Sequence, residues 1–511
     1  MKSTIIKGTV VLTLATLIIK ILSASYRIPY QNFVGDIGYY VYQQAYPFYA
    51  VFLLLVTQGF PVVLSKLFIE AREKSLELEI YTRKYVKNIL IVFSLFCFCS
   101  LFIFSKNLSY FMGDSYLSPV IRMISFVYLL LPFLAFKRGV YQSYYTFVPT
   151  AISQLVEQII RVTIIILSAV VLSSLGYSVY KVAEGAFLGA FIGGAFALVV
   201  LTSYTNKPNT TIKKPVISKQ QQNKMRKNFY IYTFSIGTTC LLMVLFQLAE
   251  SINLYKLLLI NYSELEAKTL KGVYDRAWPL IQLGLVIATS LALNIIPVIT
   301  SEKTKEKQLE TICSAVKFTV MISLAASIGL IAIMKPTNMF LFTDTKETLC
   351  LQVLALCIFF GSIIITLSSI LQGLGDMFTC AIAIIIGFLL KILLNVWMVP
   401  HFGLLGAATT TVVLLAAIAI YLYYVVNKKL EIQCLSITMW VKIIVITLIM
   451  GGSILYITNQ LVVVGRLQHA VLAISCAIIG VIIFVVGILV SNVLTPKERE
   501  ALPLLNKIKR R

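Results

Sequence analysis

Seven ionisable side chains lie inside long apolar stretches of this sequence, where a charge is costly unless it is paired or faces water. Five are cations and two are carboxylates, so the excess is positive. A cavity with that balance suits an anionic group such as a phosphate or pyrophosphate, and arginine offers a bidentate fork for its oxygens. It would repel lipophilic cations. The cations are Lys20, Arg27, Arg161, Arg276 and Lys391, and the carboxylates are Glu157 and Glu250.

The spacing of four of these residues suggests how they are arranged. Glu157 and Arg161 are four apart on one expected helix and can pair directly. That spacing fits a structural ion pair as well as a functional one. Lys20 and Arg27 are seven apart, hence on one helix face, with no acid in the same helix. Facing a cavity is the favoured interpretation, and the alternative is extension of both side chains to the membrane interface.

The remaining candidates belong to the second half of the chain. Glu250 lies deep in an apolar stretch, with Lys256 on another helix face. An isolated buried carboxylate tends to take up a proton, so Glu250 is a candidate for coupling to an ion gradient. Asp275 and Arg276 stand together at the expected head of a helix. Arg276 is a candidate for substrate binding, with an outer-leaflet anchor as the alternative.

The sequence lacks the residue patterns expected for metal binding, ATP binding or catalysis. Only two histidines occur, His401 and His469, and the nine cysteines form no C-x-x-C pair, so no metal site is expected. There is no G-x-x-x-x-G-K-[ST] sequence, which argues against ATP binding. No catalytic constellation has a polar domain to hold it. We therefore expect neither an enzyme nor a cofactor.

The elements that hold these residues are membrane-spanning helices. The chain is 59% hydrophobic and 13% charged over 511 residues, with apolar blocks long enough to cross a bilayer. Backbone groups in lipid must be satisfied internally, so the blocks are helices. The sequence predicts an all-α polytopic membrane protein with about fourteen spans. They are 5–33, 44–66, 88–105, 118–136, 148–174, 183–204, 229–258, 276–299, 311–334, 349–371, 378–399, 405–426, 437–458 and 470–493.

The net charge of +23 is explained by topology. Most lysines and arginines fall in the N-terminus, the C-terminus and the loops that follow even-numbered spans. That bias places both termini in the cytoplasm of a bacterial inner-membrane protein and makes nucleic acid an improbable partner. The basic tail that ends at Arg511 could rest on anionic lipid.

Internal repetition suggests two similar halves. Segment 42–47 (YQQAYP) resembles 274–279 (YDRAWP), at an offset of 232. At an offset of 230, Gln142 matches Gln372 and Arg161 matches Lys391, although Gly387 replaces the carboxylate. We predict two parallel six-helix repeats, 1–204 and 229–427, joined by a cytoplasmic linker at 205–228. Residues 428–511 add two spans and the tail. A cavity between such lobes is typical of a transporter.

Several motifs resemble one family. The segments K7-G-T, K20-I-L-S with Arg27, G59-F-P, Y274-D-R and L371-Q-G-L-G are similar to the polysaccharide-transport branch of the multidrug/oligosaccharidyl-lipid/polysaccharide exporter superfamily. Within it the chain looks closest to the Gram-positive group with stage V sporulation protein B and the MurJ-type lipid II flippases. The resemblance spans nearly the whole chain and implies a multidrug-exporter-like fold.

The resemblance also implies a function. Such a flippase moves an undecaprenyl-pyrophosphate-linked sugar across the cytoplasmic membrane, with basic residues of the first and eighth helices lining its cavity. Those roles would carry to Lys20, Arg27 and Arg276. The chain departs from the Gram-negative flippases because it has the uncharged stretch 51–56 where they carry an arginine pair. That difference leaves the choice between lipid II and related lipid-linked glycans open.

Two other functions compete with a flippase. A cation-coupled multidrug exporter shares the fold but usually stops at twelve spans, and it handles cations that this cavity would repel. A non-transporting accessory protein of envelope or spore assembly would tolerate loss of every cavity charge. The expected partners are a lipid-linked glycan and membrane lipids, with envelope-synthesis enzymes as further candidates.

Overall fold

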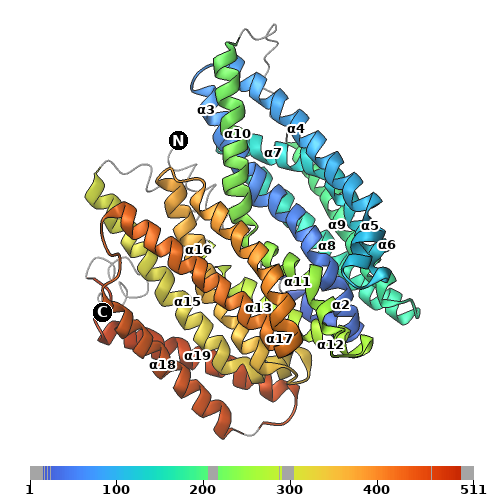
Figure 1. The fold of residues 1–511 in the computed structure, drawn as a ribbon, viewed down its shortest axis with the longest axis vertical. Coiled ribbons are helices and arrows are strands. Elements are labelled where there is room, and N and C mark those ends of the chain that lie inside the picture. Colours follow the sequence, from blue (N-terminus) through green and yellow to red (C-terminus); the bar gives the residue numbers. More distant parts are fainter. Residues whose placement is uncertain are drawn as a thin grey trace. The chain divides into compact units, whose positions relative to one another are not determined.

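The computed structural model describes residues 15, 18–19, 21–23, 25–204, 217–286, 288–289, 304–461 and 463–495. All regular structure within these ranges is helical (Figure 1). Ten of the described helical segments are long and apolar enough to cross a membrane, or eleven if one bent pair counts as a single span. The predicted all-α membrane fold is therefore confirmed, and the number of about fourteen spans stays a prediction.

Contacts divide the chain into two compact units. The first joins Met1–Val286 to Gly375–Leu414, and the second joins Ile287–Leu374 to Leu415–Arg511. These boundaries differ from those of the two predicted lobes, because residues 229–286 and 375–414 belong with the first unit. The lobes at 1–204 and 229–427 stay a prediction.

The first unit holds every predicted site residue. Its helices run from α2 to α13 in chain order, followed by the first part of α17 (Thr379–Leu430). They are α2 (Arg27–Leu54), η1 (Leu55–Gly59), α3 (Phe60–Arg72), α4 (Leu76–Ile103), α5 (Ser105–Phe111), η2 (Ser115–Leu117), α6 (Ser118–Ser125), η3 (Phe126–Leu130), α7 (Leu131–Ser143), α8 (Val148–Ser174), α9 (Val179–Ser203), α10 (Lys219–Cys240), α11 (Leu242–Leu258), α12 (Glu264–Asp275) and α13 (Ala277–Gly284).

Two glycines replace expected loops with kinks. Gly35 (φ 70°) lies in the helical segment Ile21–Arg72, and Gly403 (φ 59°) lies in the segment Thr379–Leu430. Each segment has 52 residues, and each glycine has a positive φ. Residues other than glycine rarely adopt such φ values, so the helical path turns there. A helix of that length extends about 78 Å, far more than one crossing of a core roughly 30 Å thick. The segment Thr379–Leu430 can thus hold two consecutive predicted spans, and Ile21–Arg72 can hold the second span with the end of the first.

The predicted linker is partly helical. Residues 205–216 lie outside the described ranges, but α10 begins at Lys219, where the Ser218 hydroxyl accepts from the Gln221 backbone N–H as an N-cap. The polar start of α10 contacts α4, where the Arg226 guanidinium donates to the Tyr81 hydroxyl at 2.7 Å. The predicted seventh span is bent by 69° between α10 and α11. The described end of the predicted linker is therefore helical and is held against α4.

Close packing of α8 on α9 fixes the direction of the α8 side chains. Gly185, Gly189 and Gly193 are four apart and line the face of α9 against α8. A Cβ at Gly193 would lie 2.7 Å from the Glu157 carbonyl oxygen, so only glycine fits there. The backbone that carries Glu157 and Arg161 is positioned by this contact.

The second unit is built on a long helix. Its members are α15 (Lys305–Phe342), α16 (Thr348–Gly373), the later part of α17, α18 (Ile437–Gln460) and α19 (Arg466–Val490). α15 packs against α16, α18 and α19, and the last two pack on each other. Met450 and Ile454 of α18 join Cys476 of α19 in a buried apolar cluster. α18 and α19 match the two spans predicted near the C-terminus.

Candidate functional site

Arg27 is a buried arginine whose guanidinium has no hydrogen-bond acceptor among the residues that the structure describes. It is the first residue of α2 and is fully inaccessible. Among the described residues, none of its three guanidinium nitrogens has a hydrogen-bond acceptor. The guanidinium instead lies over the Tyr46 ring, 4.3 Å from the centroid, and 6.0 Å from that of Tyr26. Cation–π contacts supply attraction but leave all the N–H donors available.

Arg161 of α8 lies beside the same aromatic rings. Its Nη2 donates to the Gln158 side-chain oxygen at 2.6 Å and to the Ser23 hydroxyl at 3.3 Å. Its guanidinium is 5.0 Å from the Tyr49 centroid and 5.5 Å from that of Tyr26. Nε and Nη1 are buried and have no partner in the described part of the chain. Tyr26 therefore contacts both arginines.

Buried tyrosines surround these two guanidinium groups. Tyr39, Tyr42, Tyr46 and Tyr49 of α2 recur every three or four residues, which places these four on one helix face. Three of the buried hydroxyls, those of Tyr30, Tyr39 and Tyr49, have no partner among the described residues. The site is thus a set of unsatisfied N–H and O–H donors, which is unusual in a folded interior. Its tyrosines are Tyr26, Tyr30, Tyr39, Tyr42, Tyr46 and Tyr49.

The expected pairing of Glu157 with Arg161 is wrong. Glu157 accepts from Arg138 Nη2 at 2.7 Å, and both side chains are buried. Arg138 of α7 also donates to the Ser153 hydroxyl and the Val56 carbonyl. Spacing of four residues permits a pair, but on α8 these side chains point to different neighbours. Sequence reasoning missed Arg138 because it follows the predicted end of the fourth span.

Arg276 and Asp275 are each paired with a different partner. Arg276 lies at the junction of α12 and α13, is fully buried, and donates through Nη2 to Asp36 at 2.5 Å. Asp275 accepts from Lys271 Nζ at 2.6 Å. The close approach needs Gly272, because a Cβ there would lie 2.3 Å from the Asp36 carbonyl oxygen. Arg276 thus links α12 to α2 in this state.

The expected isolation of Glu250 is also wrong. Lys391 Nζ lies 3.2 Å from the Glu250 carboxylate, and both side chains are fully buried. The Thr411 hydroxyl donates to the same carboxylate oxygen at 3.0 Å. The Tyr274 hydroxyl also donates to this oxygen. Lys391 further donates to the Ala407 carbonyl at 2.7 Å. The partner Lys391 lies 141 residues later in the chain, on another helix, so spacing within one helix could not reveal it.

The structure therefore separates the predicted cations into two kinds. Arg276 and Lys391 are neutralised by carboxylates, whereas Arg27 and Arg161 have no carboxylate within ion-pair distance in the described ranges. Lys20 lies outside the described residues. The residues that sequence reasoning missed are Asp36, Arg138 and Lys271, since each lies near or beyond the predicted end of a span.

Comparisons with known proteins agree on the type of protein. The sequence model of the family described as "Polysaccharide biosynthesis protein" matches residues 5–303. The chain is 34% identical to "Uncharacterized membrane protein YabM" of Bacillus subtilis (strain 168), over 98% of the chain and 95% of that protein. It is 24% identical to "Lipid II flippase MurJ" of the same organism, over 94% of both chains.

Solved structures show the same fold. "Lipid II flippase MurJ, inward closed conformation" aligns with a TM-score of 0.66 at 17% identity, covering 94% of this chain and 98% of that one. An inward-facing multidrug resistance transporter of the MATE family aligns with a TM-score of 0.64 at 14% identity, covering 81% of this chain and 94% of that one. At these identities the likeness concerns the fold alone.

Proposed function

We propose that this protein is a flippase. The chain belongs to the polysaccharide biosynthesis protein family, in the polysaccharide-transport branch of the multidrug/oligosaccharidyl-lipid/polysaccharide exporter superfamily. The protein moves an undecaprenyl-pyrophosphate-linked oligosaccharide or peptidoglycan precursor across the cytoplasmic membrane by alternating access. Arg27 and Arg161 hold the pyrophosphate. Both termini are cytoplasmic, and envelope-synthesis enzymes are candidate partners.

The observation that supports this proposal is the buried guanidinium of Arg27, which has no acceptor within the described part of the chain. A buried charge without a counter-ion destabilises a protein by several kcal/mol, so its retention calls for a ligand that neutralises it. Arg161 adds two more unsatisfied donors beside the same tyrosine. A pyrophosphate offers enough oxygens for all of them, and each charge-assisted hydrogen bond contributes about 1.5–3 kcal/mol.

The other ionisable residues take supporting roles in this proposal. Lys20 stays a candidate for substrate binding from the sequence, and it lies outside the described residues. Arg276 and Lys391 are paired in this state, and Arg276 becomes available to substrate when its contact with Asp36 opens. Glu250 stays the candidate for coupling to an ion gradient, now as a member of an ion pair. Glu157 holds Arg138 and keeps the neighbouring Arg161 free of a carboxylate.

The test combines depletion with complementation. Loss of the protein should make an undecaprenyl-linked precursor accumulate on the inner leaflet, where its mass identifies the glycan. Arg27→Ala and Arg161→Ala should fail to complement at matched membrane abundance. Lys181→Ala, which removes an exposed cation paired with Glu184, is the matched control and should complement. Full complementation by both arginine variants would refute the anion site.

A multidrug-type exporter is the second candidate, because the fold of this chain also matches the MATE transporter structures. Its substrates are lipophilic cations, which two unpaired buried arginines would repel. If the protein is a flippase, its deletion should leave resistance to lipophilic cations unchanged. Increased drug susceptibility without precursor accumulation would favour the exporter instead.

A further inference from the structure

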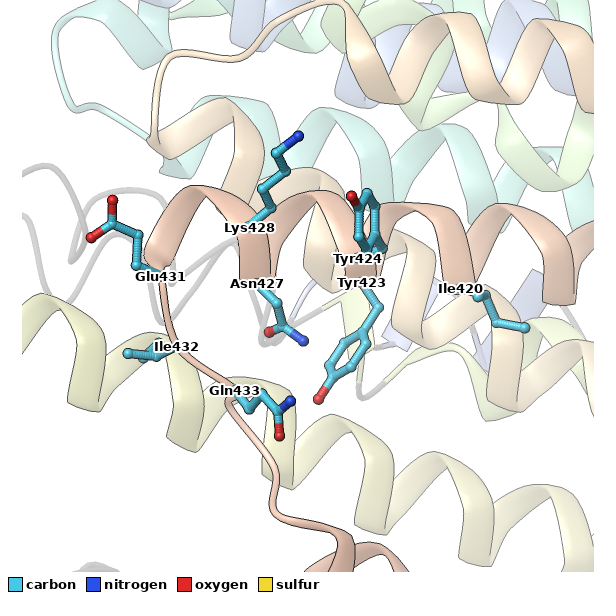
Figure 2. Close-up of a pocket in the computed structure, with 8 residues that line it drawn as sticks. All are labelled: Ile420, Tyr423, Tyr424, Asn427, Lys428, Glu431, Ile432 and Gln433. Atoms are coloured by element: carbon cyan, nitrogen blue, oxygen red, sulfur yellow. The ribbon is translucent and has the colours of Figure 1, made fainter.

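A buried carboxylate outside the arginine site lies where four predicted outer loops meet. Asp114 belongs to the turn between α5 and η2, and its neighbours come from the connections 34–43, 175–182 and 259–275. Each of these connections follows an odd-numbered predicted span. All of them belong to the first unit. The surface pocket at the end of α17 belongs to the second unit and shares no residue with this cluster (Figure 2).

The Asp114 carboxylate orients two tyrosines. Its Oδ2 accepts from the Tyr180 hydroxyl of α9 at 2.7 Å and from the Tyr40 hydroxyl of α2 at 3.2 Å. Its Oδ1 accepts from the Tyr116 backbone N–H at 3.1 Å and caps η2. Hydrogen bonds to a charged acceptor are stronger than those to a neutral one. The two tyrosine rings are therefore held in fixed directions.

Each of these tyrosines contacts a helix of the second predicted repeat. The Tyr40 ring lies against Tyr255 of α11, with centroids 5.0 Å apart. Lys268 Nζ of α12 lies 5.7 Å from the Tyr180 ring centroid and 3.8 Å from Asp114 Oδ2. Asp114, α2 and α9 belong to the first predicted repeat, whereas α11 and α12 belong to the second. One carboxylate thus supports three contacts between the repeats.

Gly113 brings the same turn close to α11. Its φ is 89°, and a Cβ there would lie 3.2 Å from Lys256 Cβ, so the backbone and the space both favour glycine. α12 also packs along α2, where Arg276 donates to Asp36 (Figure 1). The predicted outer ends of the two repeats are therefore in contact in this state.

Lys268 has two carboxylate neighbours of different kinds. Glu264 lies 2.6 Å from its Nζ, is exposed, and stands one turn earlier on α12 itself. That pair would move with α12 and would persist if the repeats separated. Asp114 is buried on the other repeat, where water screens a charge less. Only the Asp114 contact thus depends on whether the outer ends are together.

We propose that Asp114 is the positioning residue of a latch that holds the predicted outer side of the protein closed. The latch consists of Asp114, Tyr40, Tyr180 and Lys268, and it opens when α11 and α12 move away from α2 and α9. The inference rests on the alternating access of the proposed function but not on the choice of substrate. Loss of the latch shifts the equilibrium toward a state that is open to the outside.

A cysteine at position 251 reports whether this side is open. Ser251 of α11 is buried, and its carbonyl oxygen accepts from the Gln44 side chain of α2 at 2.8 Å. In a chain without native cysteines, an impermeant thiol reagent should label Ser251→Cys slowly in intact cells. Asp114→Asn should raise the labelling rate about tenfold, which corresponds to about 1.4 kcal/mol. Asparagine loses the charge but keeps the oxygen that caps η2, so the turn should still fold.

Glu264→Gln is the matched control. It removes the exposed carboxylate from the same lysine and should leave the labelling rate unchanged. Lys268→Met should raise the rate, and adding it to Asp114→Asn should give less than the product of the two single effects, because both act on one contact. Unchanged labelling in Asp114→Asn, or an equal rise in Glu264→Gln, would refute the latch.

Tyr180→Phe tests the latch without removing a charge. It keeps the ring but loses the hydrogen bond to Asp114, so the labelling rate should rise by about threefold. Tyr177→Phe, at an exposed tyrosine three residues earlier, should label at the original rate. Equal rates in the two tyrosine variants would show that the hydroxyl does not hold the outer side closed.

The labelling test and the flippase test can fail independently. Labelling measures opening, whereas precursor accumulation after depletion measures transport of the lipid-linked glycan. Faster labelling in Asp114→Asn without precursor accumulation on depletion would support the latch and refute the flippase. Precursor accumulation on depletion, with unchanged labelling in Asp114→Asn, would refute the latch alone.

Discussion

Arg138 donates to Glu157 across 2.7 Å, and this contact determines the state of a third residue. Glu157 is the nearest acid along α8 to Arg161, at a spacing that permits a pair. Because its carboxylate points to α7, the Arg161 guanidinium instead lies among Gln158 and the tyrosines. One ion pair thus produces one uncompensated cation.

The Arg138–Glu157 pair should behave as a structural unit. Arg138→Met leaves a buried carboxylate unpaired and should reduce the free energy of unfolding by about 3–5 kcal/mol. The double variant with Glu157→Met removes both charges and should recover most of that loss. Thermal unfolding in detergent, analysed as a double-mutant cycle, measures the coupling. Additive losses would show that the two side chains do not depend on each other.

Arg27 and Arg161 should show the opposite behaviour. Arg27→Met and Arg161→Met each remove a buried charge that has no carboxylate partner among the described residues, so neither should lower the unfolding temperature. Substrate affinity should fall about tenfold to a hundredfold, because 1.4 kcal/mol corresponds to a factor of ten. Unfolding in detergent and complementation at equal abundance provide the two readouts. Destabilised variants that still complement would assign these arginines to the fold.

The Arg276–Asp36 contact should be needed for the state described here. Arg276→Lys keeps the charge but loses the bidentate fork, so it should be impaired less than Arg276→Ala. Exchange of the two charges, Arg276→Asp with Asp36→Arg, should restore part of the activity that either single change removes. Complementation measures each variant. An inactive exchange alongside an active Asp36→Asn would show that Arg276 acts without its partner.

Glu250 and Lys391 should be linked in stability and in pH dependence. Glu250→Gln leaves the Lys391 ammonium buried beside a neutral group and should lower the unfolding temperature, whereas Glu250→Gln with Lys391→Met should restore it. If the pair couples transport to protons, this double variant should transport at a rate independent of pH. Flipping measured in vesicles across a pH series tests this. An unchanged pH profile would remove Glu250 from coupling.

The orientation can be tested with single cysteines in a chain from which the native cysteines have been removed. Leu265 and Lys219 are both exposed and lie at the starts of α12 and α10, on opposite predicted faces, so each is changed to cysteine. An impermeant thiol reagent should label position 265 in intact cells and position 219 only in opened ones. Labelling of position 219 in intact cells would reverse the topology and the direction of transport.

The sequence alone determined the class of fold and the charges of interest. Burial of backbone groups in lipid forces helices, so apolar blocks such as 148–174 and 470–493 predict their elements directly. The cost of a charge in lipid likewise made Arg27, Arg161 and Glu250 visible without a structure. Both inferences depend only on how a single segment or a single side chain interacts with the surrounding lipid, so they need no knowledge of tertiary contacts.

Only the tertiary structure decided which of those charges are compensated. Lys391 and Glu250 meet because α17 packs beside α11, and Arg276 reaches Asp36 because Gly272 lets α12 approach α2. Such partners come from helices far apart in the chain, and side-chain direction on a helix depends on what packs against each face. The periodicity of a sequence predicts on which face of its helix a side chain lies, but it does not predict which other helix packs against that face. Hence only the tertiary structure identified Arg27 and Arg161 as buried cations without a carboxylate partner in the described ranges.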